Sequence, residues 1–149
     1  MPITIDNNID VLLKIWDTAG QERYMTLTKQ YFYSLDGLLM VYDPACRETF
    51  EKVEFWLNQI KETINIDSIV IFLVENIQSI KNTKCTSEEG KQLADKFNLK
   101  FYSVNSNNGM NIDQCFRDLA QAIYNKMKNR VKTNNNIQVN KPKEKCIIF

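Results

Sequence analysis

Polar residues that could bind a metal ion or a phosphate follow four apolar runs in this chain of 149 residues. The runs are DVLLKIW (10–16), GLLMVYD (37–43), SIVIFLVE (68–75) and KFYSV (100–104). The candidate site residues at their ends are Asp17, Gly20 and Gln21; Asp43 and Pro44; Glu75 and Asn76; and Asn105, Ser106 and Asn107. In open α/β sheets, ligands bind beyond the carboxyl ends of the strands, so we expect the functional chemistry at that edge.

The stretch WDTAGQERY (16–24) contains three residues suited to phosphate chemistry. A carboxylate directly after an apolar strand, as Asp17 is, is well placed for a metal-bound water or a phosphate-bound Mg²⁺. A glycine such as Gly20 lets backbone N–H groups approach an anion closely, and Gln21 could orient an attacking water. A plainer interpretation is that Asp17 caps the next helix and Gly20 makes a turn.

Amphipathic segments separate the apolar runs and indicate the elements that position these residues. Apolar side chains recur at helical spacing in 46–64, 86–97 and 111–127, and the second segment opens with a possible capping box, Thr86 with Glu89. Buried runs that alternate with such helices predict an α/β fold with a mostly parallel sheet covered on both faces. The opening ITIDNNIDVLLKIW (3–16) predicts a hairpin.

Composition narrows the class of protein. With 44% hydrophobic residues the chain can form one domain with a core, and its net charge of +1 indicates no nucleic-acid partner. It has no histidine, and its four cysteines form no CxxC, so metal ligation is not expected. No signal peptide precedes the domain, and no run is long enough to span a bilayer. We expect a cytosolic, reduced protein.

The complete stretch WDTAGQERY resembles the switch II signature of Ras-superfamily GTPases, and its Trp and Glu-Arg are similar to the Rab branch. YFYSLDGLLMVYD (31–43) resembles the Rab sequence YYRGADGIIVVYD, ETFEKVEFWL (48–57) the next helix, and NNGMNIDQCF (107–116) the last loop and helix. The resemblance covers most of 3–127 without large gaps. It implies a Ras-type G domain, a P-loop-NTPase-like α/β fold whose first strand and P-loop are missing here.

The resemblance also implies a site for GTP or GDP and Mg²⁺. Asp17 would hold the Mg²⁺ through water, Gly20 would donate its N–H to the γ-phosphate, and Gln21 would position the attacking water. Thr18 and Ala19 complete the switch II part of this nucleotide site.

The base-binding side departs from the family. The family's NKxD loop is matched by NIQS (76–79), in which only Asn76 is kept. The family's aspartate accepts hydrogen bonds from guanine N1 and N2, a charge-assisted pair that a serine hydroxyl cannot replace. The family's Ser-Ala-Lys loop reads Asn-Ser-Asn here, so Ser106 and Asn107 would keep a backbone contact only. Glu75 stands where the family has glycine and would add a negative charge next to the nucleotide.

No P-loop of the form GxxxxGK[ST] occurs in the sequence, and its one Gly-Lys pair, Gly90-Lys91, begins a helix away from the predicted site. A P-loop supplies a nest of backbone N–H groups, a lysine on the phosphates and a hydroxyl on Mg²⁺. The switch I threonine has no counterpart either, because Thr4 comes too late in the family order. We expect nucleotide binding and hydrolysis to be crippled in this chain.

In the family, the first strand lies between the strands that match 10–16 and 37–43. Its loss would open a gap of about two strand spacings, roughly 10 Å. We expect either that those strands close up directly or that their apolar edges stay exposed. Both outcomes predict low stability for this chain alone and make strand swapping between copies plausible.

The C-terminal part has a different composition. Lys126 to Cys146 contains seven Lys/Arg residues and one acid, a net +6 that leaves about −5 for the rest. Because helical periodicity stops near Met127, we expect a partial G domain over 1–127 and a disordered basic tail over 128–149. The ending CIIF is a C-a-a-X box, and its Phe favours geranylgeranyl on Cys146. One prenyl chain anchors reversibly, so the lysines would supply a second membrane signal.

Three hypotheses follow. In the first, the protein is a prenylated Rab-like module of vesicle traffic on the cytosolic face of endomembranes, and it presents switch II to Rab escort or GDI-type proteins and effectors without cycling. In the second, it is the C-terminal part of a GTP-hydrolysing Rab whose P-loop segment is absent from this sequence. In the third, it is an unstable product without function. The two separate defects, in the P-loop and in NIQS, favour the first.

Overall fold

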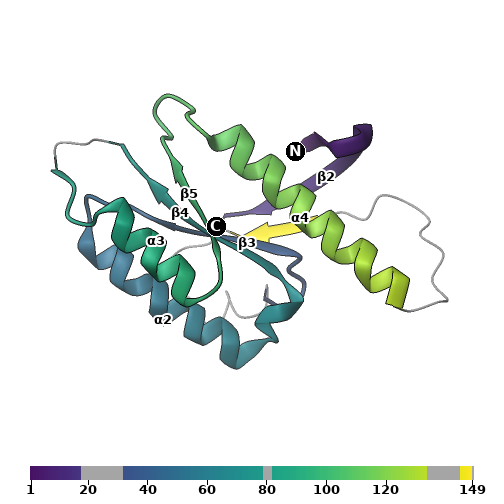
Figure 1. Ribbon diagram of the computed structural model, residues 1–149, viewed down its shortest axis with the longest axis horizontal. Helices are drawn as coiled ribbons and strands as arrows, with labels where there is room; N and C mark the ends of the chain where they lie inside the picture. Colours follow the sequence, from purple (N-terminus) through teal and green to yellow (C-terminus); the bar gives the residue numbers. More distant parts are fainter. Residues whose placement is uncertain (18–31, 79–81, 134–144, 149) are drawn as a thin grey trace.

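The computed structural model describes residues 1–17, 32–78, 82–133 and 145–148. The elements are β1 (Pro2–Ile5), η1 (Asp6–Asn8), β2 (Ile9–Trp16), β3 (Gly37–Tyr42), α2 (Arg47–Thr63), η3 (Ile66–Ser68), β4 (Val70–Asn76), α3 (Ser87–Lys96), β5 (Lys100–Val104), α4 (Ile112–Thr133) and β6 (Lys145–Ile148). Strands that alternate with helices confirm the expected α/β architecture (Figure 1). None of the helices within these ranges has the length and hydropathy needed to cross a bilayer.

The strands form one sheet in the order β1-β2-β6-β3-β4-β5. β1 and β2 pair antiparallel, which confirms the predicted hairpin, and the turn between them uses Asn8 at φ 54°. Asparagine tolerates this left-handed conformation better than most residues. Every other neighbouring pair is parallel, and the carboxyl ends of β3, β4 and β5 meet at one edge. β2 ends earlier, because its last residue Trp16 and Leu38 of β3 both pair with Ile148.

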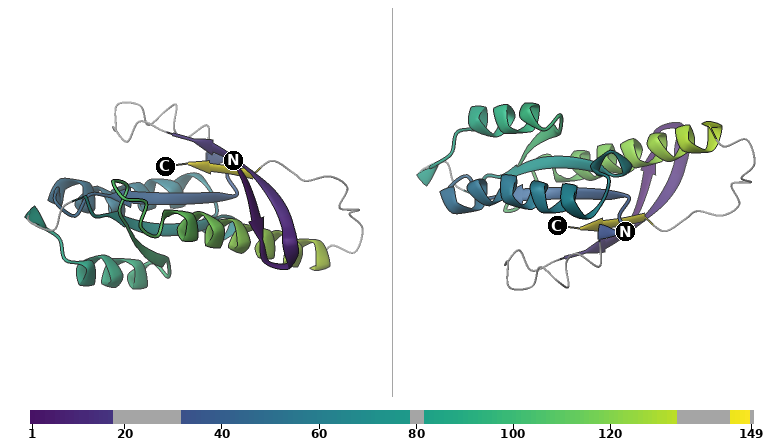
Figure 2. Two further views of the ribbon diagram at one scale, coloured as in Figure 1. Left: turned by 90° about the horizontal axis from the view of Figure 1, so that it is seen from above. Right: turned by 90° about the horizontal axis from the view of Figure 1, so that it is seen from below.

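The position between β2 and β3 is filled by β6, from the far end of the chain. Figure 1 shows this strand in yellow between them, and Figure 2 shows it beside the purple hairpin. The sequence predicts a gap that closes up or leaves open edges, and both expectations are wrong. The expected disordered tail also differs from the structure, because α4 continues to Thr133 and residues 145–148 form a strand.

Two cores lie on opposite faces of the sheet, because successive side chains of a strand point to opposite sides. Leu38 and Leu73 belong to the core that α2 and α3 cover, together with Val53, Leu57 and Ile60 of α2. Their neighbours on β3 and β4 belong to the core that α4 covers, whose buried members are Ile5, Val11, Leu13, Leu39, Phe72, Val74, Val104, Cys115, Leu119, Ala120 and Ile123. The predicted apolar stripes of α2 and α4 therefore face the sheet.

The start of α3 follows the predicted capping box. The Thr86 hydroxyl accepts a hydrogen bond from the Glu89 N–H, and the Glu89 carboxylate accepts one from the Thr86 N–H. This reciprocal pairing satisfies two N–H groups that a helix end would otherwise leave unpaired. It fixes where α3 begins, beside the carboxyl end of the sheet.

Candidate nucleotide-site remnant at the carboxyl edge

The predicted site residues follow the carboxyl ends of four parallel strands: Asp17 follows β2, Asp43 follows β3, Asn76 ends β4, and Asn105 follows β5. β3, β4 and β5 end together, because Tyr42 pairs with Glu75 and Glu75 with Ser103. β2 ends earlier, because Trp16 and Leu38 both pair with Ile148, so Asp17 lies level with the first half of β3. β6 and β3 also stand between β2 and β4, so Asp17 is at least three strand spacings, roughly 14 Å, from Asn76. The predicted site residues therefore form two separate parts, one at Asp17 and one at Asn76.

On the first part, the structure describes Asp17 but not the residues that follow it. The Asp17 side chain is exposed, next to the half-exposed ring of Trp16, over which the Lys14 ammonium lies 5.2 Å from the ring centroid. Thr18, Ala19, Gly20 and Gln21 lie outside the described residues, so their predicted phosphate and water contacts stay predictions. An exposed carboxylate at a strand end remains suited to a hydrated Mg²⁺.

On the second part, the loops after β4 and β5 are joined by the side chain of Asn76. Its Oδ1 accepts a hydrogen bond from the Ser106 N–H at 3.0 Å, and its Nδ2 donates one to the Ser106 hydroxyl oxygen at 3.0 Å. The Ile77 N–H donates to the Val104 carbonyl at 2.7 Å. Both ends of the Asn76 amide are thus engaged within the protein.

The loop after β5 is held by its own asparagines. Asn105 Oδ1 accepts hydrogen bonds from the N–H groups of Asn107 and Asn108, at 2.9 and 3.3 Å. Asn107 Nδ2 donates to the Gln78 carbonyl at 3.4 Å. Gly109 takes φ 79°, in the region that favours glycine. The predicted base-side residues Asn76, Ser106 and Asn107 are therefore brought together.

These groups do not fit guanine as the family's loop does. Among residues 76–78 and 105–111, no carboxylate is available to accept from guanine N1 and N2, and the Asn76 amide is already paired. Ser79, at the position of the family's aspartate, is outside the described residues. The arrangement ties two loops together without a carboxylate acceptor for the base.

Glu75 differs from the expectation that it faces a nucleotide. Its side chain is fully buried, and its two carboxylate oxygens accept hydrogen bonds from the Tyr42 hydroxyl at 3.2 Å and the Ser87 hydroxyl at 2.6 Å. Burial, followed by the charge of Glu75, raises the pKa of Tyr42. Sequence reasoning missed this link, because Tyr42 and Glu75 are far apart in the sequence and become neighbours only through the parallel register of β3 with β4.

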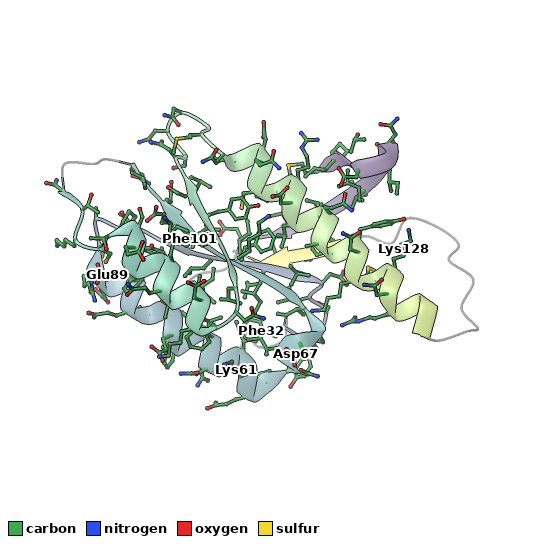
Figure 3. All side chains as sticks on the ribbon, viewed as in Figure 1. Phe32, Lys61, Asp67, Glu89, Phe101 and Lys128 are labelled. Atoms are coloured by element: carbon green, nitrogen blue, oxygen red, sulfur yellow. The ribbon has the colours of Figure 1, made fainter. Side chains whose placement is uncertain are left out.

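The glycine of the Gly90-Lys91 pair has a role in packing that does not involve a P-loop. A Cβ at this position would lie 2.3 Å from the Tyr42 hydroxyl oxygen and 2.7 Å from the Phe101 ring. The glycine therefore lets α3 approach β3 and β5 closely, which is a packing role. Figure 3 labels Phe101, which packs against the core under α3, and Glu89, in the first turn of that helix.

Asp43 also serves local structure. Its Oδ1 accepts a hydrogen bond from the Ala45 N–H at 2.8 Å, and its carbonyl accepts from the Thr49 hydroxyl and the Cys46 N–H. These bonds shape the turn before α2. Over the part of the chain that the structure describes, no group of three or more metal-ligating side chains occurs.

Part of the predicted basic tail belongs to the folded domain. Lys126 Nζ donates a hydrogen bond to the Ile69 carbonyl at 2.6 Å, and burial lowers the pKa of Lys126. The Arg130 guanidinium donates to the Ser68 carbonyl. These contacts hold α4 against the segment before β4. Arg130, which lies within the predicted disordered tail over 128–149, therefore contacts the folded domain.

Comparison with known families matches residues 2–125 to the Ras family. Ras-related protein Rab-3A from Homo sapiens is 36% identical over 128 residues, which cover 85% of this chain and 58% of that protein. Ras-related protein Rab-3D from Homo sapiens is 37% identical over 118 residues, with coverage of 78% and 53%. Ras-related protein Rab-26 from Rattus norvegicus is 31% identical over 117 residues, with coverage of 78% and 46%. The chain spans about half the length of the curated relatives it matches.

Proposed function

The chain belongs to the Ras family, and we propose that it is a Rab-like protein of membrane traffic that acts as a binding module without a nucleotide cycle. The similar proteins reported above are all Ras-related Rab proteins, which supports the Rab branch. In this proposal the surface around switch II and its neighbouring helices contacts effectors and escort or GDI-type proteins.

The proposal rests on the hydrogen bonds that the side-chain amide of Asn76 makes with Ser106. Two hydrogen bonds to Ser106 use both ends of the one residue that the base-binding loop retains. Guanine recognition needs a carboxylate acceptor for N1 and N2, which residues 76–78 and 105–111 lack, and the Asn76 amide would lose its hydrogen bonds to Ser106 if it turned to a ligand. Together with the absence of GxxxxGK[ST] from the 149 residues, this favours weak or absent nucleotide binding.

The test is a titration of the purified 149-residue chain with fluorescent GDP and GTP in excess Mg²⁺. We expect no saturable signal up to about 100 μM nucleotide, which corresponds to a binding free energy weaker than about −5.5 kcal/mol. Heat-denatured protein should also release no guanine nucleotide. Stoichiometric nucleotide after purification, or saturation at micromolar concentration, would contradict the proposal.

We also propose that Cys146 is prenylated and that the lipid holds the protein at the cytosolic face of an endomembrane. The C-a-a-X motif acts only when Phe149 is the last residue, so the mass of the endogenous protein tests both points at once. We expect a mass that reflects loss of the last three residues and gain of one geranylgeranyl group. Cys146→Ser should move a tagged chain from the membrane fraction to the soluble one, whereas Cys46→Ser should not.

A second candidate function is GTP hydrolysis by a longer protein of which this chain is the C-terminal part. The retained stretch from Asp17 to Gln21 and the partial coverage of the relatives favour it. The same mass measurement separates the two candidates. A mass several kilodaltons above that of the 149 residues would favour the GTPase, and a match to residue 1 onward would favour the binding module.

A further inference from the structure

The position of β6 is the feature that carries a further inference. Its residues pair in parallel with β2 on one side, in the register Leu13↔Lys145, Lys14↔Cys146, Ile15↔Ile147 and Trp16↔Ile148. On the other side Gly37 pairs with Ile147 and Leu38 with Ile148. β6 thus lies in the middle of the sheet, paired with β2 along all four residues and with β3 at Ile147 and Ile148.

The inner edges of β2 and β3 explain why a strand belongs there. Both strands contribute to the buried cores, through Leu13 on β2 and Leu38 and Leu39 on β3. Without a strand between them, their facing N–H and C=O groups would lose their sheet partners, and an unpaired strand edge readily accepts another strand. The two edges are therefore a preformed acceptor for an extended segment that runs parallel to both.

The occupant is supplied by the chain itself. The strand residues Lys145–Ile148 include two β-branched isoleucines, which suits a central strand, whereas residues 134–144 are Asn- and Lys-rich in sequence. The linker 134–144, fully extended, reaches at most about 36–40 Å, which allows a return to the sheet after α4. A parallel strand needs such a long crossover connection, and α4 with the linker provides it.

We propose that the slot between β2 and β3 is a strand-binding site for the C-terminal segment Lys145–Ile148, and that its occupation withholds Cys146 from lipid transfer. The second clause rests on the prenylation of Cys146 proposed above. A segment that pairs with β2 at Cys146, and with both β2 and β3 at the next two residues, cannot also lie extended in a transferase site. The chain therefore has a closed form, with β6 in the sheet, and an open form in which the segment is free for modification.

The two forms predict an order of events. Lipid transfer proceeds through the open form, so its rate is reduced by the fraction of chains that are open. A prenylated Cys146 held at a membrane then leaves the slot without its own strand. The edges of β2 and β3 are then unpaired in the lipidated protein.

The register of Lys14 with Cys146 gives a direct test of the closed form. We expect the chain with Lys14→Cys to form an intramolecular disulfide between positions 14 and 146 under mild oxidation, because directly paired residues of neighbouring strands have suitable Cα separations. Leu12→Cys is the matched control, since it lies two residues earlier on the same strand and outside the β6 pairing. Equal cross-linking of the two variants to Cys146, or none in either, would overturn the proposal.

Hydrogen exchange tests the strand without any lipid. Amide exchange in residues 145–148 of the full chain should be at least tenfold slower than in a peptide of residues 141–149. Ile147→Pro removes an N–H from β6 and should abolish this protection, whereas Ile147→Val should keep it. Exchange in the chain as fast as in the peptide would overturn the proposal.

Lipid transfer separates this inference from the proposed function. With a C-a-a-X geranylgeranyltransferase and geranylgeranyl diphosphate, we expect modification of the full chain at least tenfold slower than that of the 141–149 peptide. Equal rates would overturn the withholding of Cys146. If the enzyme modifies neither substrate, the prenylation proposal fails and with it the withholding, while slow hydrogen exchange and the position 14–146 disulfide would still support the strand-binding slot.

Discussion

The amide of Asn76 illustrates how a binding residue can be kept for its effect on the fold. Its two hydrogen bonds with Ser106 join the loops after β4 and β5, which are far apart in the sequence. The neighbouring Asn107 makes one longer side-chain bond, 3.4 Å to the Gln78 carbonyl. The asparagine at position 76 is therefore explained by its role in holding the two loops together, and this role needs no ligand.

Replacement of Asn76 should reveal this structural role. We expect Asn76→Ala to lower the free energy of unfolding by about 1–2 kcal/mol, because two hydrogen bonds are lost and the Ser106 N–H is left unpaired. Asn107→Ala should change it by less than about 0.5 kcal/mol. Urea unfolding followed by tryptophan fluorescence measures both, and similar losses for the two variants would argue against the assignment.

The carboxyl group of Glu89 makes the stability of the fold depend on pH. The Thr86 N–H, followed by the Arg47 guanidinium 2.5 Å away, lowers the pKa of Glu89 from 4.5 to about 2. Because this pKa is lower in the folded state, ionised Glu89 stabilises the fold above pH 4.5, and the contribution is lost as the pH falls from 4.5 toward 2. The side chains are partly exposed, so solvent screens the effect.

The variant Glu89→Gln tests this dependence. Between pH 6 and pH 3, the melting temperature of the original chain should fall more steeply than that of the variant, since the variant lacks the titrating carboxyl. Glu88→Gln, in the same first turn of α3, is the matched control and should follow the original chain. Parallel curves for Glu89→Gln and the original chain would contradict the pKa assignment.

At the scale of elements, α3 depends on two local features of its sequence. The capping box at Thr86 fixes its start, and Gly90 allows its close contact with the sheet. Tyr42, against which Gly90 packs, is buried and also holds Glu75. The contact therefore couples the position of the helix to the only buried charged residue in the described ranges.

An alanine at position 90 should disturb this contact. We expect Gly90→Ala to destabilise the protein by about 1–3 kcal/mol, because the added methyl overlaps the Tyr42 hydroxyl and the Phe101 ring. This loss should appear even though alanine favours helix by about 1 kcal/mol over glycine. Lys91→Ala, at the next and exposed position, should be nearly neutral. Increased stability in Gly90→Ala would show that the neighbours move freely.

At the scale of the whole molecule, the sheet is completed by a strand from the end of the chain. β6 joins the hairpin to β3, β4 and β5, through its pairing with β2 and β3. Without β6, the hairpin and the strands β3, β4 and β5 would both contact α4, but no backbone hydrogen bonds between strands would join them. Stability of the 149-residue chain should therefore depend on four residues near its C-terminus.

Removal of residues 145–149 tests that dependence. We expect a lower free energy of unfolding and a concentration-dependent shift to dimers or larger species, because the edges of β2 and β3 then pair between copies. Size-exclusion chromatography with light scattering measures the mass. A chain with Lys141→Gln and Lys143→Gln keeps β6 and should remain monomeric. A stable, monomeric truncated chain would contradict the role of β6.

The sequence by itself determined the elements whose signals are local. Alternating apolar runs, helical stripes, the DNN turn and the Thr86–Glu89 box predicted the hairpin, the helices and the parallel strands, because each depends on residues a few positions apart. The carboxyl ends of neighbouring parallel strands lie together, so the meeting of Asn76 with Ser106 could be predicted as well. The separate position of Asp17 could not, because it depends on the pairing of β2 and β3 with β6.

Only the tertiary structure decided which distant groups become partners. The pairing of β6 with β2 and β3 cannot be found from CIIF alone, because a four-residue apolar segment has no periodicity that distinguishes a strand from a free tail. Likewise, Glu75 is a charge next to a binding loop in the sequence, and it becomes a buried acceptor only when Tyr42 and Ser87 are placed against it. Long-range pairing depends on the unpaired edges and polar groups that the rest of the fold leaves to be satisfied.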